Sequence, residues 1–149
     1  MGDVPARKVS GPARLLGYAG LLPQAALLLL ILGLHDPAGT VHGMAFFYAG
    51  LIFNFLGGIW WGFAMRRANG QGALAWLAVV PTLVTILLVA LAVHGSLRWA
   101  MVALASAIML TLPVDRRLVT TGEAPAGWMA LRVPLSLGLG VLTILAAMV

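Results

Sequence analysis

Five long stretches without any Asp, Glu, Lys or Arg divide this chain, and they constrain its fold more than any other feature. They cover residues 15–34, 44–65, 73–93, 99–114 and 133–149. A helix needs about 20 apolar residues to cross a hydrocarbon core about 30 Å thick. The stretches therefore predict an all-α, polytopic membrane protein, a bundle of five transmembrane helices.

Outside these stretches there is too little sequence for a second domain. Only 9% of the residues are charged, against about 25% in soluble domains. We expect a basic cytoplasmic tail over residues 1–14 and a single transmembrane domain over residues 15–149. The chain has no cysteine, which excludes disulfides, thiolate metal sites and a cysteine nucleophile.

Positive charge is confined almost entirely to alternate connections between the stretches. Arg98 is the one basic residue on the outer side of this pattern, and the other eight are Arg7, Lys8, Arg14, Arg66, Arg67, Arg116, Arg117 and Arg132. The positive-inside rule then places the N-terminus inside and the C-terminus outside. Because these residues flank apolar segments and form no basic face, we expect contact with the lipid bilayer and none with nucleic acid. We expect a bacterial inner (plasma) membrane, and one lysine against eight arginines, with abundant alanine and glycine, suggests a GC-rich genome.

Aromatic residues gather near the expected boundaries of the bilayer, where amphipathic rings are stable. Five lie toward the inner boundary, Tyr18, Trp60, Trp61, Trp76 and Trp128, and two toward the outer one, Tyr48 and Trp99. We interpret them as interfacial anchors. Asp115, beside two arginines, is interpreted as a solvated helix end, and Pro134 as part of a first helical turn.

Helix breakers and small polar residues recur at one depth, about 10–12 Å from the inner boundary at about 1.5 Å per residue. The candidate residues of this layer are Pro23, Gln24, Asn54, Gly57, Gly58, Pro81, Thr82 and Ser106. Small residues let helices pack closely, so one interpretation is a packed helix interface. The other is a small polar cavity for a lipophilic or zwitterionic ligand, and a bundle with no cavity at Gln24 and Asn54 would contradict it.

Three histidines, His35, His42 and His94, are expected at the outer face. Imidazole is a ligand for copper and for haem, but their spacing matches no established metal motif. No arrangement of acid, base and nucleophile points to catalysis, so we expect no enzyme and no catalytic residue, and the cofactor is left open.

Several runs carry a resemblance to a known family. They are Leu16-Gly17-Tyr18-Ala19-Gly20-Leu21-Leu22-Pro23, Tyr48-Ala49-Gly50, Phe55-Leu56-Gly57-Gly58-Ile59-Trp60-Trp61-Gly62, Val80-Pro81 and Asp115-Arg116. The chain resembles the uncharacterised five-span membrane proteins related to transmembrane protein 69, a domain of unknown function. Trp60 stands where that family often has His or Arg. The resemblance implies a five-span inner-membrane fold and no established activity.

Three functions remain open. The first is a non-enzymatic accessory or assembly factor that acts through helix–helix contacts with other membrane proteins or a second copy of the chain. The second is a carrier or binding protein for a small lipophilic molecule at the layer around Gln24 and Asn54. The third, least favoured, is a haem, quinone or metal redox module at the outer histidines.

Overall fold

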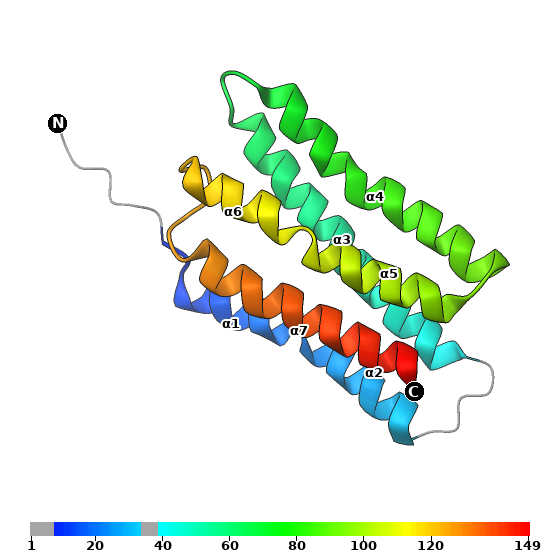
Figure 1. The fold of residues 1–149 in the computed structure, drawn as a ribbon. Coiled ribbons are helices and arrows are strands. Elements are labelled where there is room, and N and C mark those ends of the chain that lie inside the picture. The colour runs from blue at the N-terminus through cyan, green and yellow to red at the C-terminus, as the bar shows by residue number, and fades with distance from the viewer. Residues whose placement is uncertain (1–7, 34–38) are drawn as a thin grey trace.

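Every long element of the protein is a helix, as the charge-free stretches predict. The computed structural model describes residues 8–33 and 39–149. Its helices are α1 Gly11–Ala19, α2 Leu22–Gly33, α3 Thr40–Met65, α4 Gln71–His94, α5 Leu97–Met109, α6 Leu112–Thr120 and α7 Trp128–Met148 (Figure 1). Five stretches are long and apolar enough to cross a membrane, because α1 with α2 and α5 with α6 each form one span. The prediction of a five-span multi-pass membrane protein is confirmed.

The helices extend beyond the charge-free stretches. The first span begins at Gly11 rather than at residue 15, and the last begins at Trp128 rather than at residue 133. The fourth span continues to Thr120 instead of ending at residue 114. Charged residues mark the end of an apolar stretch, but they do not end a helix whose backbone hydrogen bonds continue. The expected bounds were therefore too narrow, by the most at these three places and at the start of the second span, which begins at Thr40 rather than at residue 44.

Two of the spans are interrupted, and proline follows each interruption. The first lies at Gly20 between α1 and α2, just before Pro23, and the second lies at Leu110 and Thr111, just before Pro113. Proline cannot donate a backbone hydrogen bond, so carbonyl groups near it need other donors within lipid. The Tyr48 hydroxyl of α3 donates to the carbonyl of Gly20. Tyr48 is therefore a polar contact across the bundle rather than only an outer anchor.

A third proline lies inside α7 without breaking it. Pro134 is the seventh residue of α7, not part of its first turn, because the helix begins at Trp128. It removes the donor that would bind the carbonyl of Ala130, four residues earlier. The Tyr18 hydroxyl of α1 donates to this carbonyl at 3.2 Å. The proline thus creates an acceptor that fixes α1 on α7.

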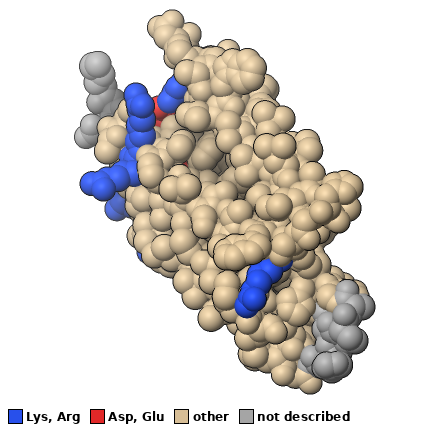
Figure 2. Space-filling model, turned by 45° about the vertical axis from the view of Figure 1, so that its right-hand side comes forward, with Lys and Arg blue, Asp and Glu red and all other residues tan. Residues whose placement is uncertain are grey.

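Helices α3 and α7 form the centre of the bundle, and each contacts three or more other helices. In contrast, α4 packs mainly on α3 and α5, and α1 packs mainly on α7 (Figure 1). The first turn of α1 and the last turn of α7 lie at opposite ends. Figure 2 shows basic side chains gathered at one end of the molecule, with a single basic group toward the other.

Candidate functional site

A buried ion pair joins α6 and α7. Arg132 Nε donates to Asp115 Oδ2 at 2.7 Å, and the two side chains are 5% and 1% exposed. Asp115 is therefore not a solvated helix end, and that interpretation was wrong. A charge within a membrane span is stable only with a partner, and these two residues supply one another.

Two indoles complete the hydrogen bonding of Asp115. Trp60 Nε1 donates to Asp115 Oδ1 at 3.0 Å, and Trp128 Nε1 donates to the same oxygen at 3.2 Å. Trp60 is only 4% exposed, so its interpretation as an interfacial anchor was wrong. A second nitrogen of Arg132, Nη2, donates to Thr111 Oγ1 at 3.2 Å.

This polar cluster connects three helices at one level of the bundle. Trp60 comes from α3, Asp115 from α6 just after the Thr111 break, and Arg132 from the second turn of α7. Gly127 precedes α7 with a φ of 83°, a conformation that favours glycine, and so lets the chain turn into that helix. The ring of Trp128 also packs edge-on against Phe63, with 5.9 Å between ring centroids.

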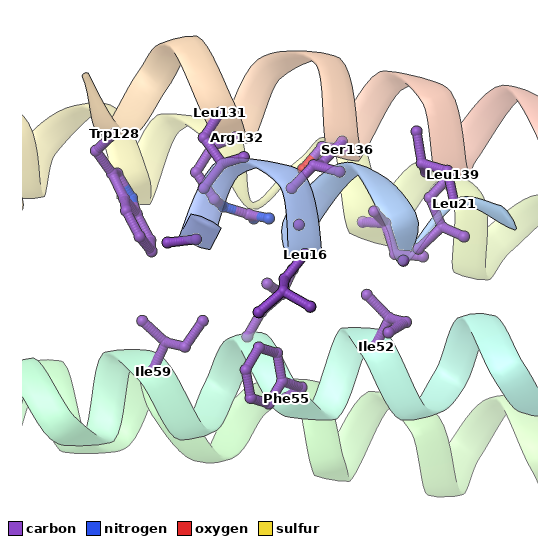
Figure 3. Close-up of a pocket in the computed structure, with 16 residues that line it drawn as sticks. Leu16, Leu21, Ile52, Phe55, Ile59, Trp128, Leu131, Arg132, Ser136 and Leu139 are labelled. Carbon is purple, nitrogen blue, oxygen red and sulfur yellow. The ribbon is translucent and has the colours of Figure 1, made fainter. Parts of the chain in front are cut away.

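Beside the polar cluster lies a cavity of about 390 Å³ between α1, α3 and α7 (Figure 3). Its walls are almost entirely apolar. They are formed by Ala13, Leu16, Gly17, Gly20, Leu21, Ile52, Phe55, Leu56, Ile59, Ile108, Trp128, Leu131, Arg132, Leu135, Ser136 and Leu139. The cavity exists because α1 packs against α7 and makes little contact with α3 over this length.

The cavity has an exposed mouth and a buried floor. Leu16 of α1 and Phe55 of α3 face one another across it, and they are 73% and 65% exposed. At its floor, Ile108 and Ser136 are each 1% exposed. The opening therefore lies between α1 and α3, on the side of the bundle that faces lipid.

The structure does not bring the predicted polar layer together. Gln24 Nε2 of α2 donates to Thr143 Oγ1 of α7 at 3.0 Å. Asn54 Nδ2 of α3 donates to Thr85 Oγ1 of α4 at 3.0 Å. Neither Gln24 nor Asn54 lines the cavity between α1 and α3. They are separate interhelical hydrogen bonds, and the ligand cavity expected at these two side chains lies instead at Arg132 and Ser136.

Of the other residues in the predicted layer, some pack against a neighbouring helix and others are exposed. A Cβ at Gly57 would overlap the carbonyl oxygen of Ala78 and lie 3.3 Å from Pro81, so α3 and α4 pack closely there. Gly58 faces open space. Pro23 and Thr82 are exposed, as is Ser106, whose hydroxyl donates to the carbonyl of Val102 at 2.9 Å.

The histidines do not form a recognisable metal centre in the part of the chain that the structure describes. His35 lies outside the described residues. His42 is half-buried near the start of α3, and His94 is exposed at the end of α4. No group of three His, Cys, Asp or Glu side chains converges among residues 8–33 and 39–149.

A second ion pair lies at the end of the bundle that carries most of the positive charge. Arg67 Nε and Nη2 donate to the two carboxylate oxygens of Glu123 at 2.6 and 2.7 Å. This hydrogen bonding holds the pKa of Glu123 below its ordinary value of 4.5, against the opposing effect of desolvation. The pair joins the end of α3 to the connection between α6 and α7.

The fold and the polar cluster define a class, a multi-pass membrane protein with five spanning helices and a lipid-facing cavity. Within that class, the chain belongs to the DUF3429 family, proteins of unknown function, whose sequence profile matches residues 9–148. No curated protein matches the chain, and no solved structure matches it. The match confirms an uncharacterised family.

Arg132 and Ser136, at the base of the cavity, escaped the sequence analysis. The sequence pattern places Arg132 among the basic residues of the connections, and it gives no sign that Ser136 is part of a site. The sequence does contain a signal for this site. Asp115 immediately follows the fourth charge-free stretch, and Arg132 immediately precedes the fifth. An ionisable residue within a span is a functional candidate by default.

Proposed function

We propose that this protein binds a small lipophilic molecule in the cavity between α1, α3 and α7, without catalysing a reaction on it. The observation that carries the proposal is the lateral opening between Leu16 and Phe55 above a buried floor. Ligand sites are commonly apolar cavities of about 300–1,000 Å³ with a few polar groups. A cavity with its mouth toward lipid can receive a molecule directly from the bilayer.

The helices around the cavity are fixed independently of any ligand. The hydrogen bonds of Asp115 hold α3, α6 and α7 together. Gly17 brings α1 close to Leu131 of α7, and Tyr18 binds the carbonyl of Ala130. Because these contacts lie beside the cavity rather than across it, they keep it open, and a preformed site costs less to occupy.

The proposal is tested by filling the cavity. Ile59 lines it and is half-buried, so Ile59→Trp places a larger ring in the same space. Ile86→Trp is the matched control, because Ile86 is 60% exposed on α4 and does not line the cavity. Each protein is purified from its native membrane in mild detergent, and bound small molecules are identified by mass spectrometry.

We expect a defined lipophile with the native protein and with Ile86→Trp, and its loss with Ile59→Trp. Equal recovery of the same molecules from all three proteins would contradict the proposal. The variants' far-ultraviolet circular dichroism confirms that each remains helical.

A second candidate function, an accessory or assembly factor, is favoured by one feature of α3. Gly58 and Gly62 are one turn apart, and each faces open space rather than another helix of the bundle. Small residues at this spacing let a helix of a partner approach closely. Gly58→Leu is expected to abolish co-purification with a larger complex, whereas Gly72→Leu on α4 is expected to leave it intact.

We also propose a membrane and an orientation for this protein. The proposed location is a bacterial inner membrane, with the N-terminus inside and the C-terminus outside, and the proposal includes a relation to transmembrane protein 69. Support for the orientation comes from the basic residues. With Arg132 removed from the count because it is buried, seven basic residues still lie on one side and Arg98 alone lies on the other.

A further inference from the structure

We infer that the floor of the cavity recognises the carbonyl oxygen of a neutral lipophile, through Ser136 and Arg132. The inference rests on the proposed binding function and deepens it, because it names the chemistry of the ligand. The oxygen can belong to a ketone or quinone, or to an ester of an uncharged bilayer lipid. These sources share one requirement, a hydrogen-bond acceptor without charge at the end of an apolar chain or ring.

Ser136 is a buried donor without an acceptor in the part of the chain that the structure describes. Ser136 is 1% exposed and is one of the residues that line the cavity, and its hydroxyl makes no hydrogen bond with any described residue. Three other hydroxyls in the spans behave differently, because Thr85, Ser106 and Thr143 each donate to the carbonyl four residues earlier. Leaving a buried polar group unpaired costs about 1–3 kcal/mol, so an acceptor in the cavity would be favoured.

Arg132 lies one turn before Ser136 on the same face of α7 and also lines the cavity. Its Nε and Nη2 are used by Asp115 and Thr111. The third guanidinium nitrogen, Nη1, takes part in no hydrogen bond with any described residue. The two residues therefore present N–H and O–H donors at one place in an otherwise apolar wall.

Charge selects a neutral ligand over an anion. The positive charge of Arg132 is already balanced by Asp115, whose oxygens also accept from Trp60 and Trp128. A carboxylate or phosphate in the cavity would leave one negative charge uncompensated away from water, which is costly. A carbonyl oxygen accepts the same hydrogen bonds and adds no net charge.

The position of Ser136 along α7 and the apolar lining of the cavity also fit a ligand with one carbonyl oxygen. Ser136 lies eight residues after the start of α7, which places it about 12 Å along the helix. Apolar side chains of Ile52, Phe55 and Leu139 surround the rest of the cavity. A molecule with one polar end and an apolar remainder fits, with its oxygen at Ser136 and its apolar part directed toward the mouth.

The test uses four probes, three of them of matched chain length, with the purified full chain in nonionic detergent. They are a long-chain methyl ketone, the corresponding alkane, the corresponding fatty acid anion and a short-chain diacylglycerol. Native mass spectrometry measures the occupancy of each probe at equal mole fraction in the micelle. Infrared spectroscopy measures the carbonyl stretching band of the bound ketone, which moves to lower frequency when the oxygen accepts hydrogen bonds.

Ser136→Ala is the principal variant, because its hydroxyl has no partner among the described residues and its loss leaves the helix contacts in place. Ser106→Ala is the matched control on the exposed surface of α5. We expect the ketone to exceed the alkane in affinity by about three- to tenfold, the value of one hydrogen bond. Ser136→Ala should remove most of this preference and reduce the shift of the carbonyl band, whereas Ser106→Ala should change neither.

Arg132→Lys is a second variant that keeps the charge opposite Asp115 but removes the guanidinium, and it should also reduce the band shift. Stronger binding of diacylglycerol than of ketone, with the same dependence on Ser136, supports the inference and assigns the oxygen to a lipid ester. Equal binding of ketone and alkane, or preference for the fatty acid anion, overturns the inference but leaves the binding function standing. If none of the four probes binds saturably, the proposed function itself fails.

Discussion

Arg132 Nε lies 2.7 Å from Asp115 Oδ2, and this ion pair is withdrawn almost completely from solvent. Asp115 belongs to α6 and Arg132 to α7, so the pair connects two helices across a connection in the chain. The same arginine lines the cavity. Structure and proposed function therefore depend on one side chain, and variants must separate the two roles.

Breaking the pair from one side is expected to destabilise the protein strongly. Arg132→Met leaves the Asp115 carboxylate buried without its cation, and such a loss costs about 3–5 kcal/mol. The double variant Asp115→Asn with Arg132→Met should recover most of that loss, because no buried charge remains while Asn still accepts from the indoles. The free energy of unfolding is measured by titration with sodium dodecyl sulfate in mixed micelles. Additive effects of the two substitutions would contradict a coupled pair.

Two adjacent tryptophans are expected to respond differently to the same change. Trp60→Phe removes a hydrogen bond to a carboxylate and should lower the free energy of unfolding by about 1–3 kcal/mol. Trp61 is 47% exposed, so Trp61→Phe should change it by less than about 0.5 kcal/mol. The two variants are compared in the same titration. A larger effect at Trp61 would show that interfacial anchoring, not the buried cluster, stabilises this part of α3.

Two adjacent glycines on α3 offer a second matched comparison. Gly57→Ala should push α3 away from Ala78 of α4, because the added methyl group has no space. Overpacking of this kind costs about 1–3 kcal/mol. Gly58→Ala faces open space and should stabilise the helix by about 0.5–1 kcal/mol. Thermal unfolding in detergent should therefore move in opposite directions for the two variants.

The Arg67–Glu123 pair predicts a dependence of stability on pH. The pKa of Glu123 is lower in the folded protein than its ordinary value, chiefly through the hydrogen bond from Arg67. The folded state therefore binds the proton less tightly, and the contribution of the pair is present above the ordinary pKa and lost as pH falls through the folded one. Because both side chains are partly exposed, the loss is about 0–1 kcal/mol.

The measurement compares unfolding at pH 7 and at pH 3 or below. Glu123→Gln should remove this part of the pH dependence, and Arg67→Gln should do the same. Arg66→Gln is the control, because the neighbouring Arg66 is exposed and does not contact Glu123. An unchanged pH profile in Glu123→Gln would show that other groups carry the dependence.

The charge-free stretches predict the number of membrane spans and their helical class but not where several of the helices end. Charge-free length identifies a span, since a bilayer excludes unpaired charge. It does not show that α6 continues through Asp115 and two arginines, because a helix includes charged residues when a partner or the aqueous boundary accommodates them. The interpretation of Trp60 as an interfacial anchor was wrong because an indole, which prefers a bilayer boundary, can also donate a hydrogen bond to a buried carboxylate.

The candidate site was predictable only in part. Gln24 and Asn54 are predicted to lie in one layer, at a packed interface or in a polar cavity, and each hydrogen-bonds to a neighbouring helix. Equal depth does not mean contact, however, because residues at one level can face different neighbours around a bundle. The sequence placed these two side chains in one layer, and the structure separates them on α2 with α7 and on α3 with α4.

What the sequence alone determined is a membrane protein with five spans, because apolar length against bilayer thickness is a property of each segment by itself. The tertiary structure decided which charges are buried, since Asp115 and Arg132 meet only when α6 and α7 lie side by side. It also decided where a ligand could enter. The cavity forms because α1 packs against α7 and makes little contact with α3. This packing is a relation between helices, so no single segment encodes it.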